Sequence, residues 1–433
     1  MRINRLLLFT LFVIICAQGI FPYSAAAADL PGKTQLAEKA RMAERGEYLT
    51  IKILTIGQGD PVYLWYGHIA IIVEDSLTNT EILYDYGVFD FKQDNFFRNF
   101  AMGRLIYGVI ATPAKYRISQ AEHELRNMSS ATLNIPPEKR YEVAVFLQEN
   151  VKPGNNTYLY HHYYDNCSTR IRDVVNLAVD GQLKEWAEPQ PGKMSLRDHI
   201  RRHSGKNYFM DWILNFLQSD VIDAQISLWD DMFLPEELNQ NLQKFYYTDA
   251  SGNSVKLVSN YEVLTDFQNR PVIPSKPAVY WPFGVAVGML IGFIGLILSI
   301  LSVKTKNTLW RAMYGTYTAL YGLFFGILGT ALLLMMIFTN QDVTFNNENI
   351  LLASPILLWV GILGILIAAG KEKCIRLQKL LLIIQAISGI LLLFLKGVAG
   401  GIFDQQNWFI ISLLIPSLLL LSRFWIKEKK QEL

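Results

Sequence analysis

The chain has 433 residues, of which 51% are hydrophobic and 18% are charged, and its formal net charge is +2. A charge this close to zero gives no indication of a nucleic-acid partner. The three cysteines lie in three different regions, so they form neither a disulfide framework nor a zinc-type spacing. We therefore expect no cofactor and no metal site, while the length allows more than one domain.

Residues 1–28 have the order of a secretory signal peptide. Arg2 and Arg5 precede an apolar core, and a run of small residues ends at Ala28. This pattern predicts export of the following segment, with cleavage near Ala28. Cys16 follows three bulky residues, which argues against lipoprotein processing at that position. An uncleaved anchor is the alternative, and it would place the next segment on the same side of the membrane.

Residues 29–270 read as one exported domain that mixes helical and strand periodicities, which predicts an α+β fold. His68 stands at the start of an apolar strand, and the segment 81–86 is expected to be its hairpin partner. Further strands are predicted at 48–56 and 105–112, and a terminal hairpin arm at 255–264. Helices are predicted at 36–46, 95–102, 119–128, 136–148, 194–202 and 211–217. A proline-rich linker follows at 271–277.

Residues 278–433 contain five apolar runs, at about 279–302, 312–338, 350–370, 378–396 and 407–426. Each is near the roughly 20 residues that cross a bilayer. Lysine and arginine follow the first, third and fifth runs but are absent from 339–349 and 397–406. The positive-inside rule therefore predicts five transmembrane helices with the C-terminus in the cytoplasm. It puts the domain before them on the other side, in agreement with the signal peptide.

The stretch 158–173 carries the only cysteine between the signal segment and the apolar runs, Cys167. Asp165, Asn166 and Ser168 are helix-starting residues, and apolar positions recur behind them at helical spacing. Cys167 is therefore expected at a helix N-terminus, where backbone N–H groups and the helix dipole favour a thiolate. A buried, inert cysteine that acts as a small apolar residue is the alternative.

Six histidines compete as the base for this thiol. His68 follows a glycine and opens an apolar strand, where a histidine has little local reason to be, although a satisfied core histidine would look the same. His161 and His162 lie six and five residues before Cys167, and one of them is expected to face the site. In an extended segment, however, they are too far along the chain to guarantee contact with Cys167. The other three are expected to face solvent, and they are His123, His199 and His203.

Gly67-His68 at a strand start, followed about a hundred residues later by Asp165-Asn166-Cys167, resembles the circularly permuted, papain-like branch of the NlpC/P60 superfamily. That branch includes proteins similar to lecithin:retinol acyltransferase. More closely, LTIGQGDPVYLWYGHIAI, YDYGVFDF, NFAMGRLIYGV and YYDNCSTRIRD resemble the DUF4105 family. This family is the N-terminal periplasmic domain of Lnb-type lipoprotein N-acyltransferases. The resemblance covers about residues 47–230, and it implies a papain-like α+β domain.

The resemblance implies a function in the bacterial inner membrane. Cys167 would take an acyl chain from a membrane phospholipid as a thioester, with His68 as its base, and pass it to the N-terminal amine of a lipoprotein. Asp85 is the first choice as the group that orients His68, with Tyr66 and Asp165 as alternatives. Backbone N–H groups at the helix start are candidates for an oxyanion hole.

Three residues are candidates for substrate binding: Asn166, Tyr66 and Arg170. Helix capping is the competing role for Asn166, and pairing with nearby acids is the competing role for Arg170 and Arg172. The aromatic segments 89–100 and 208–212 either rest on the membrane surface or pack in a core.

Two other functional classes stay open on the residues alone. The same Cys–His pair serves hydrolases of peptidoglycan peptides or of lipid esters. A non-catalytic membrane scaffold with a structural cysteine is the second. The five apolar runs favour a lipid substrate, and they act either as a tether or as a lateral cavity for acyl chains.

Overall fold

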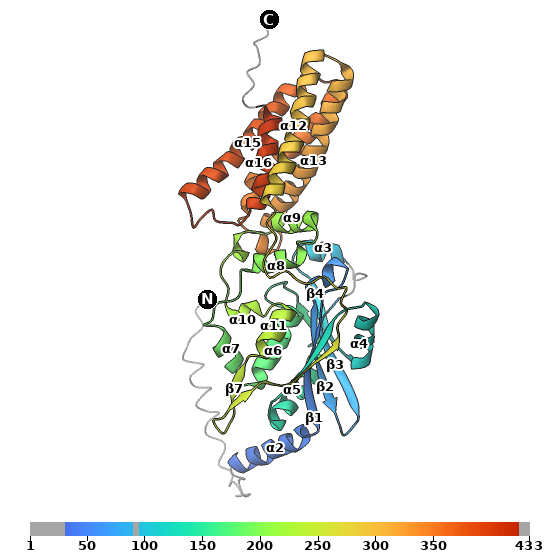
Figure 1. The fold of residues 1–433 in the computed structure, drawn as a ribbon, viewed down its shortest axis with the longest axis vertical. Coiled ribbons are helices and arrows are strands. Elements are labelled where there is room, and N and C mark those ends of the chain that lie inside the picture. Colours follow the sequence, from blue (N-terminus) through green and yellow to red (C-terminus); the bar gives the residue numbers. More distant parts are fainter. Residues whose placement is uncertain (1–30, 90–94, 424–433) are drawn as a thin grey trace, which may run out of the picture.

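The computed structural model describes residues 31–89 and 95–423. The predicted signal peptide, 1–28, lies outside these described residues. An N-terminal α+β part is followed by a group of long helices, and the two parts lie end to end (Figure 1). Residues 271–277, between them, contain no helix or strand.

The α+β part is built on one seven-stranded antiparallel sheet with the strand order β6-β4-β3-β2-β1-β5-β9. Its strands are β1 (Leu49–Ile56), β2 (His68–Asp75), β3 (Thr80–Val88), β4 (Ile106–Pro113), β5 (Met128–Leu133), β6 (Thr157–Leu159) and β9 (Val258–Thr265). A separate two-stranded ribbon consists of β7 (Tyr246–Thr248) and β8 (Ser254–Lys256). The hairpin of β2 and β3 and the strand character of 48–56 and 105–112 are as predicted.

The helices of this part fall on both faces of the sheet. They are α2 (Pro31–Gly46), α3 (Phe96–Ala101), α4 (Ala114–His123), α5 (Pro137–Asn150), α6 (Cys167–Ala178), α7 (Gln182–Ala187), α8 (Leu196–Ser204), α9 (Tyr208–Leu217), α10 (Leu228–Asp231) and α11 (Pro235–Leu242). Helices α5, α6 and α11 pack on one face, and α4 lies on the other (Figure 1).

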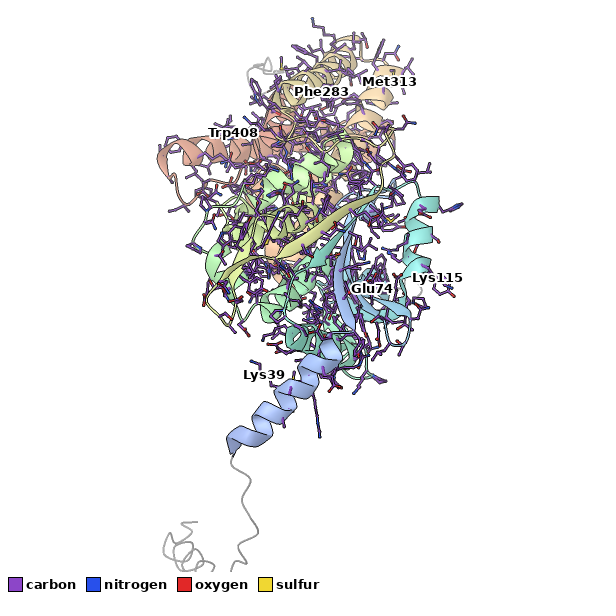
Figure 2. The ribbon with its side chains drawn as sticks, turned by 60° about the horizontal axis from the view of Figure 1, so that its bottom comes forward. Lys39, Glu74, Lys115, Phe283, Met313 and Trp408 are labelled. Atoms are coloured by element: carbon purple, nitrogen blue, oxygen red, sulfur yellow. The ribbon has the colours of Figure 1, made fainter. Side chains whose placement is uncertain are left out.

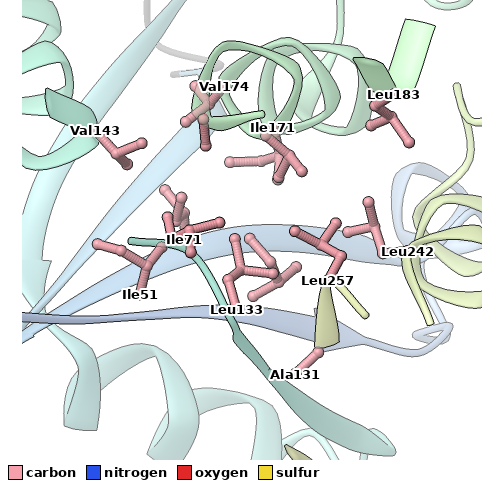
Figure 3. Close-up of a cluster of buried hydrophobic side chains, with 14 of the residues drawn as sticks. Ile51, Ile71, Ala131, Leu133, Val143, Ile171, Val174, Leu183, Leu242 and Leu257 are labelled. Carbon is pink, nitrogen blue, oxygen red and sulfur yellow. The ribbon is translucent and has the colours of Figure 1, made fainter. Parts of the chain in front are cut away.

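The main core lies between the sheet and helices α5 and α6. Ile51 and Ile71 from the sheet meet Val143 of α5 and both Ile171 and Val174 of α6, all nearly inaccessible to solvent (Figure 3). On the other face of the sheet, a smaller buried cluster packs against α4 and includes Leu54 and Ile56 of β1 and Ala70 and Ile72 of β2. Each fully buried side chain of this size contributes about 1.5–3 kcal/mol, so the centre of the sheet is the most stably held part.

The helix predicted at 119–128 is wrong in its second half. Helix α4 ends at His123, and Leu125 adopts a left-handed conformation with φ of 52°. Arg126 is completely buried and donates from Nε to the carbonyl oxygen of Gly57 at 2.9 Å, which ties the turn to β1. Strand β5 begins two residues later. The strand was not predicted because its small residues, SSAT, are almost all buried and show no alternation of apolar and polar residues.

The C-terminal part consists of α12 (Trp281–Thr305), α13 (Thr308–Phe338), α14 (Ile356–Ala368), α15 (Cys374–Val398) and α16 (Trp408–Ser422). Within the described residues, four helices are long and apolar enough to cross a membrane, and the third of these runs from Glu348 to Ala368. The prediction of five spans is corrected to four. Helix α16 has 15 residues, or about 22 Å at 1.5 Å each, which is short of a bilayer core of about 30 Å.

Glycines allow these helices to approach closely. Gly284, Gly288 and Gly292, spaced by four residues on α12, face α16, and a Cβ at Gly288 would lie 2.3 Å from the carbonyl oxygen of Leu413. Small residues at this spacing are how helices pack where lipid removes the hydrophobic drive between them. The outer surface is apolar: Phe283, Met313 and Trp408, labelled in Figure 2, are 43–53% exposed.

The two parts are joined by a polar junction and an aromatic one. The segment after α13 returns to the sheet domain, where Asn340 accepts from Arg104 Nε at 2.9 Å and Asp342 lies 3.0 Å from His161 Nε2. Trp212 and Phe216 of α9 are buried against the helices. Within 208–212, Tyr208 and Trp212 therefore pack against the helical part, whereas Phe209 is 55% exposed.

Candidate active site

Cys167 is the first residue of α6, as the sequence predicts. The cap is Asn166, whose Oδ1 accepts from the backbone N–H groups of Ser168 at 2.8 Å and Thr169 at 3.0 Å. Thr169 Oγ1 in turn accepts from the backbone N–H of Asn166 at 2.8 Å, which completes a capping box. The N–H of Cys167 belongs to the first turn, where no intrahelical acceptor exists, so it is available to a ligand. Cys167 is a partly buried free thiol.

His68 is the first residue of β2 and pairs with Ile56, the last residue of β1. Gly67, just before His68, has a φ of 76°. A Cβ at Gly67 would lie 3.0 Å from the carbonyl oxygen of Ile56, so both the conformation and the space require glycine. The Gly67-His68 pair is therefore a structural unit that fixes where the imidazole begins.

Asp85 of β3 is hydrogen-bonded to His68, with Nε2 and Oδ1 2.5 Å apart. The register that pairs Ile71 with Tyr84 brings Asp85 within reach of β2's first residue. Helix α6 packs across β2 and β3, which carries Cys167 to the same place. Interaction with Cys167, by charge and by hydrogen bonding, contributes to the raised pKa of His68, so the thiol lies near the imidazole. Since Nε2 is bound to Asp85, Nδ1 is the nitrogen left for the thiol.

The electrostatics of the three groups favour an imidazolium at His68. Burial by itself lowers the pKa of His68, but the charges of Asp85 and Cys167 and the hydrogen bonds to both raise that pKa to about 9. Burial raises the pKa of Asp85, yet the His68 charge and hydrogen bond and the nearby Arg117 and Arg126 leave that pKa below its ordinary value. Arg117 Nε lies 3.4 Å from Asp85 Oδ2. Asp85 is therefore ionised, and Arg117 is a supporting charge that the sequence did not reveal.

Two of the three predicted substrate-binding residues are engaged in the fold. Asn166 also donates from Nδ2 to the carbonyl oxygens of His162 at 2.7 Å and Phe233 at 3.1 Å. With two donated and two accepted bonds its amide is saturated, which gives Asn166 the capping role that competes with the predicted substrate contact. Arg170 forms a bidentate pair with Asp165, at 2.5 and 2.6 Å. This pairing also takes Asp165 away from His68, which leaves Asp85 as the orienting group.

Tyr66 is the third predicted substrate-binding residue. It precedes Gly67 and packs against His162 and His203, at ring-centroid distances of 5.0 and 5.3 Å. Burial, followed by the charge of Asp211, raises the pKa of Tyr66, so it is a neutral phenol. Its predicted role in substrate binding stays a prediction.

The expectation that three histidines face solvent holds for His123 alone. His199 and His203 are 0% and 2% exposed. His199 Nε2 lies 2.5 Å from Asp231 Oδ1, and His203 Nδ1 lies 2.9 Å from the carbonyl oxygen of Trp65. The basic appearance of this helix misled the prediction, because its charged residues turn inward to buried acids and carbonyls, as Arg202 does toward Glu237.

Tyrosines line one side of Cys167. Tyr158 and Tyr160 both feel the charge of Cys167, and burial is the main reason that the pKa of each is raised. Tyr160 stacks on Tyr107 at 4.1 Å between centroids, and Tyr107 stacks on Phe89 at 4.9 Å. An aromatic row thus runs from the thiol toward α3, which is a candidate surface for an acyl chain.

Two cavities among the described residues lie away from this site. One, of about 420 Å³, is lined by α2 and α5, and the other, of about 690 Å³, lies where α8 meets the starts of α12 and α16. Neither is lined by Cys167, His68 or Asp85. Across residues 31–89 and 95–423, no group of three or more histidine, cysteine, aspartate and glutamate side chains is arranged to hold a metal ion.

A comparison with protein families finds a match for residues 38–202, to the family described as the Lnb N-terminal periplasmic domain. The matched segment runs from within α2 to within α8 and includes β1 to β6, and so it contains Cys167, His68 and Asp85. No curated protein matches the chain, and no solved structure does.

Proposed function

Because residues 38–202 of this chain belong to the Lnb N-terminal periplasmic domain family, we propose that it is a membrane-bound lipoprotein N-acyltransferase. The observation that carries the proposal is the Cys167–His68–Asp85 arrangement at the start of α6, in a domain attached to four candidate membrane spans. The acyl donor is a membrane phospholipid, and the acceptor is the N-terminal amine of a diacylglyceryl-cysteine lipoprotein.

In the first half-reaction, the Cys167 thiolate attacks the ester carbonyl carbon of the phospholipid. His68 holds the proton taken from the thiol, and the raised pKa of His68 keeps that proton in place at neutral pH. When the tetrahedral intermediate collapses, the C–O bond breaks and His68 protonates the departing lysophospholipid oxygen. The products are a thioester on Cys167 and a neutral His68, still bound to Asp85.

In the second half-reaction, the α-amine of the lipoprotein attacks the thioester. Neutral His68 accepts a proton from that amine, the C–S bond breaks, and the N-acylated lipoprotein leaves while the Cys167 thiolate and the His68 imidazolium are restored. A thioester suits this step because it reacts readily with amines. Exclusion of water by the aromatic side of the site favours transfer over hydrolysis.

We assign residues 29–270 to the periplasm, as a circularly permuted papain-like catalytic domain, and 271–277 to a linker. Residues 278–433 form the inner-membrane part. Lysine and arginine gather in the segments that follow α12 and α14, whereas 339–349, which contacts the catalytic domain, has neither, and this asymmetry supports a periplasmic location for 339–349 and for that domain.

The proposal is tested by mass spectrometry of the intact protein after incubation with phospholipid vesicles, for the wild type and for Cys167→Ala. A fatty-acyl adduct on the wild type alone, discharged by a synthetic diacylated lipopeptide with a free N-terminus, is the expected result. An N-acetylated lipopeptide is the matched acceptor control and should leave the adduct in place.

The same experiment separates the two rival functions. An adduct that water discharges as fast as the lipopeptide does would indicate a lipid hydrolase. No adduct, together with cleavage of peptidoglycan fragments that needs Cys167, would indicate a peptidase. A folded wild type that does neither would leave a structural scaffold, and the acyltransferase proposal would be abandoned.

A further inference from the structure

Tyr158 is a partly buried tyrosine beside the active site, and its hydroxyl has no partner in the described part of the fold. It belongs to β6, where it pairs with Tyr107 of β4. The guanidinium of Arg170 lies 4.3 Å from the centre of its ring, and the ring of Tyr86 lies 6.5 Å away on centroids. The ring is thus held in one position by its neighbours.

The hydroxyl oxygen of Tyr158 is inaccessible to solvent and has no hydrogen-bond partner among the described residues. A buried polar group without a partner costs about 1–3 kcal/mol, so such groups are uncommon unless a function retains them. Phenylalanine at this position would supply the same packing without this cost.

The unpartnered hydroxyl faces the space in front of Cys167. Gly87, which borders this space, has a φ of 90°, a conformation that favours glycine. A Cβ placed on Gly87 would lie 3.5 Å from Cys167 Cβ, 3.8 Å from the Tyr158 hydroxyl oxygen and 4.0 Å from the Cys167 backbone nitrogen. One methyl-sized volume is therefore bordered by the nucleophile's side chain, its backbone N–H and the tyrosine hydroxyl.

We propose that Tyr158 is a further catalytic residue, whose hydroxyl donates a hydrogen bond to the carbonyl oxygen of the acyl group as Cys167 attacks it. Together with the backbone N–H of Cys167 it forms a two-donor oxyanion hole. The inference rests on the proposed function in requiring acyl transfer at Cys167, but it applies to any ester donor.

The Cys167 sulfur forms a bond to the carbonyl carbon, and the electron pair of the C=O double bond moves to the oxygen. The hydroxyl of Tyr158 and the N–H of Cys167 stabilise that oxyanion without transferring a proton. The electron pair then returns, the bond to the leaving oxygen breaks, and His68 supplies its proton.

The surroundings of Tyr158 keep its hydroxyl protonated, so that it can donate a hydrogen bond. Burial and then the negative charge of Cys167 raise the pKa of its hydroxyl well above the ordinary value, although Arg170 acts in the opposite direction. The hydroxyl therefore stays protonated beside a thiolate over the working pH range.

The test compares Tyr158→Phe with Tyr86→Phe, both as full-length protein in detergent or vesicles. Tyr86 is the matched control, because its hydroxyl is also buried and unpartnered while its ring lies next to Tyr158. The rate of acyl-adduct formation is measured against phospholipid concentration. We expect Tyr158→Phe to lower the maximal rate about 10²–10³-fold with little change in the half-saturating concentration, the loss typical of one oxyanion donor. Tyr86→Phe should keep the wild-type rate.

Alkylation of Cys167 by iodoacetamide provides the second readout, since that reaction forms no oxyanion. Its rate and its pH dependence should be the same in Tyr158→Phe and in the wild type. A slower alkylation or a shifted pH dependence would assign the hydroxyl to the thiolate instead, and unchanged acylation would remove the role altogether. Either result overturns the inference.

An activated aryl ester separates this inference from the proposed function. If phospholipid fails to acylate the wild type but the aryl ester succeeds, the lipid assignment fails and the Tyr158→Phe comparison is decided with the aryl ester. If neither ester acylates Cys167 in the folded wild type, both proposals fall.

Discussion

Replacing Asp85 by asparagine removes one charge from the site and keeps its shape. Asp85 is 7% exposed, and its Oδ1 lies 2.5 Å from His68 Nε2. The rise in the pKa of His68 from 6.5 to about 9 corresponds to roughly 3 kcal/mol of preference for the imidazolium. The charge of Asp85 is the largest contribution that raises the pKa of His68. Asp85→Asn should therefore lower the pKa of His68 by about one to two pH units, toward 6.5.

The assay is the pH dependence of acyl-adduct formation on Cys167. His68 must carry a proton to release the leaving oxygen, so the wild-type rate should fall as pH rises through about 9. In Asp85→Asn this alkaline limb should begin about one to two pH units lower, with a roughly 10- to 100-fold lower rate at pH 8. The contribution of His68 to the free energy of unfolding also falls as the pH rises. Because the folded pKa is raised, the contribution of His68 is full below pH 6.5 and is lost as pH rises through about 9.

Asp165→Asn is the matched control. Asp165 is an alternative orienting group from the sequence, but its carboxylate is bound to Arg170. This substitution should leave the alkaline limb where it is. An Asp85→Asn protein that is folded and has the wild-type pH profile would refute the reasoning, and a shift in Asp165→Asn instead would identify that residue as the orienting group.

Three further variants test the fold around the site. Asn166→Ala removes the cap of α6 and should lower the free energy of unfolding by about 1–2 kcal/mol, measured by thermal or denaturant melting, and an unchanged midpoint would contradict the capping role. His199→Ala leaves its buried acidic partner unpaired and should cost about 3–5 kcal/mol, whereas exposed His123→Ala should change stability by less than about 0.5 kcal/mol. Gly322→Ala would place a Cβ 2.3 Å from a backbone nitrogen of α14 and should reduce the yield of folded protein in detergent, while Gly397→Ala, with nothing within 4 Å, should not.

The sequence by itself determined the elements whose signals are local. The cap residues before Cys167 predicted a helix start there, and the Gly67-His68 pair with its apolar continuation predicted a strand. Charge asymmetry and apolar runs predicted a helical part after residue 277. Each of these depends on neighbours along the chain, which is why the start of α6 and the β2–β3 hairpin were anticipated within a few residues.

Only the tertiary structure decided what these elements do to one another. Strand register and the packing of α6 on β2 and β3 brought Cys167, His68 and Asp85 together across about a hundred residues. The burial of the polar residues of α8 was also not predictable from the sequence. A buried histidine with an acidic partner has the same local sequence as a solvent-exposed histidine. The same is true of the Tyr158 hydroxyl, which nothing in the chain marks until the sheet turns it toward the thiol. Burial and pairing are long-range properties, so they are decided by packing rather than by sequence pattern.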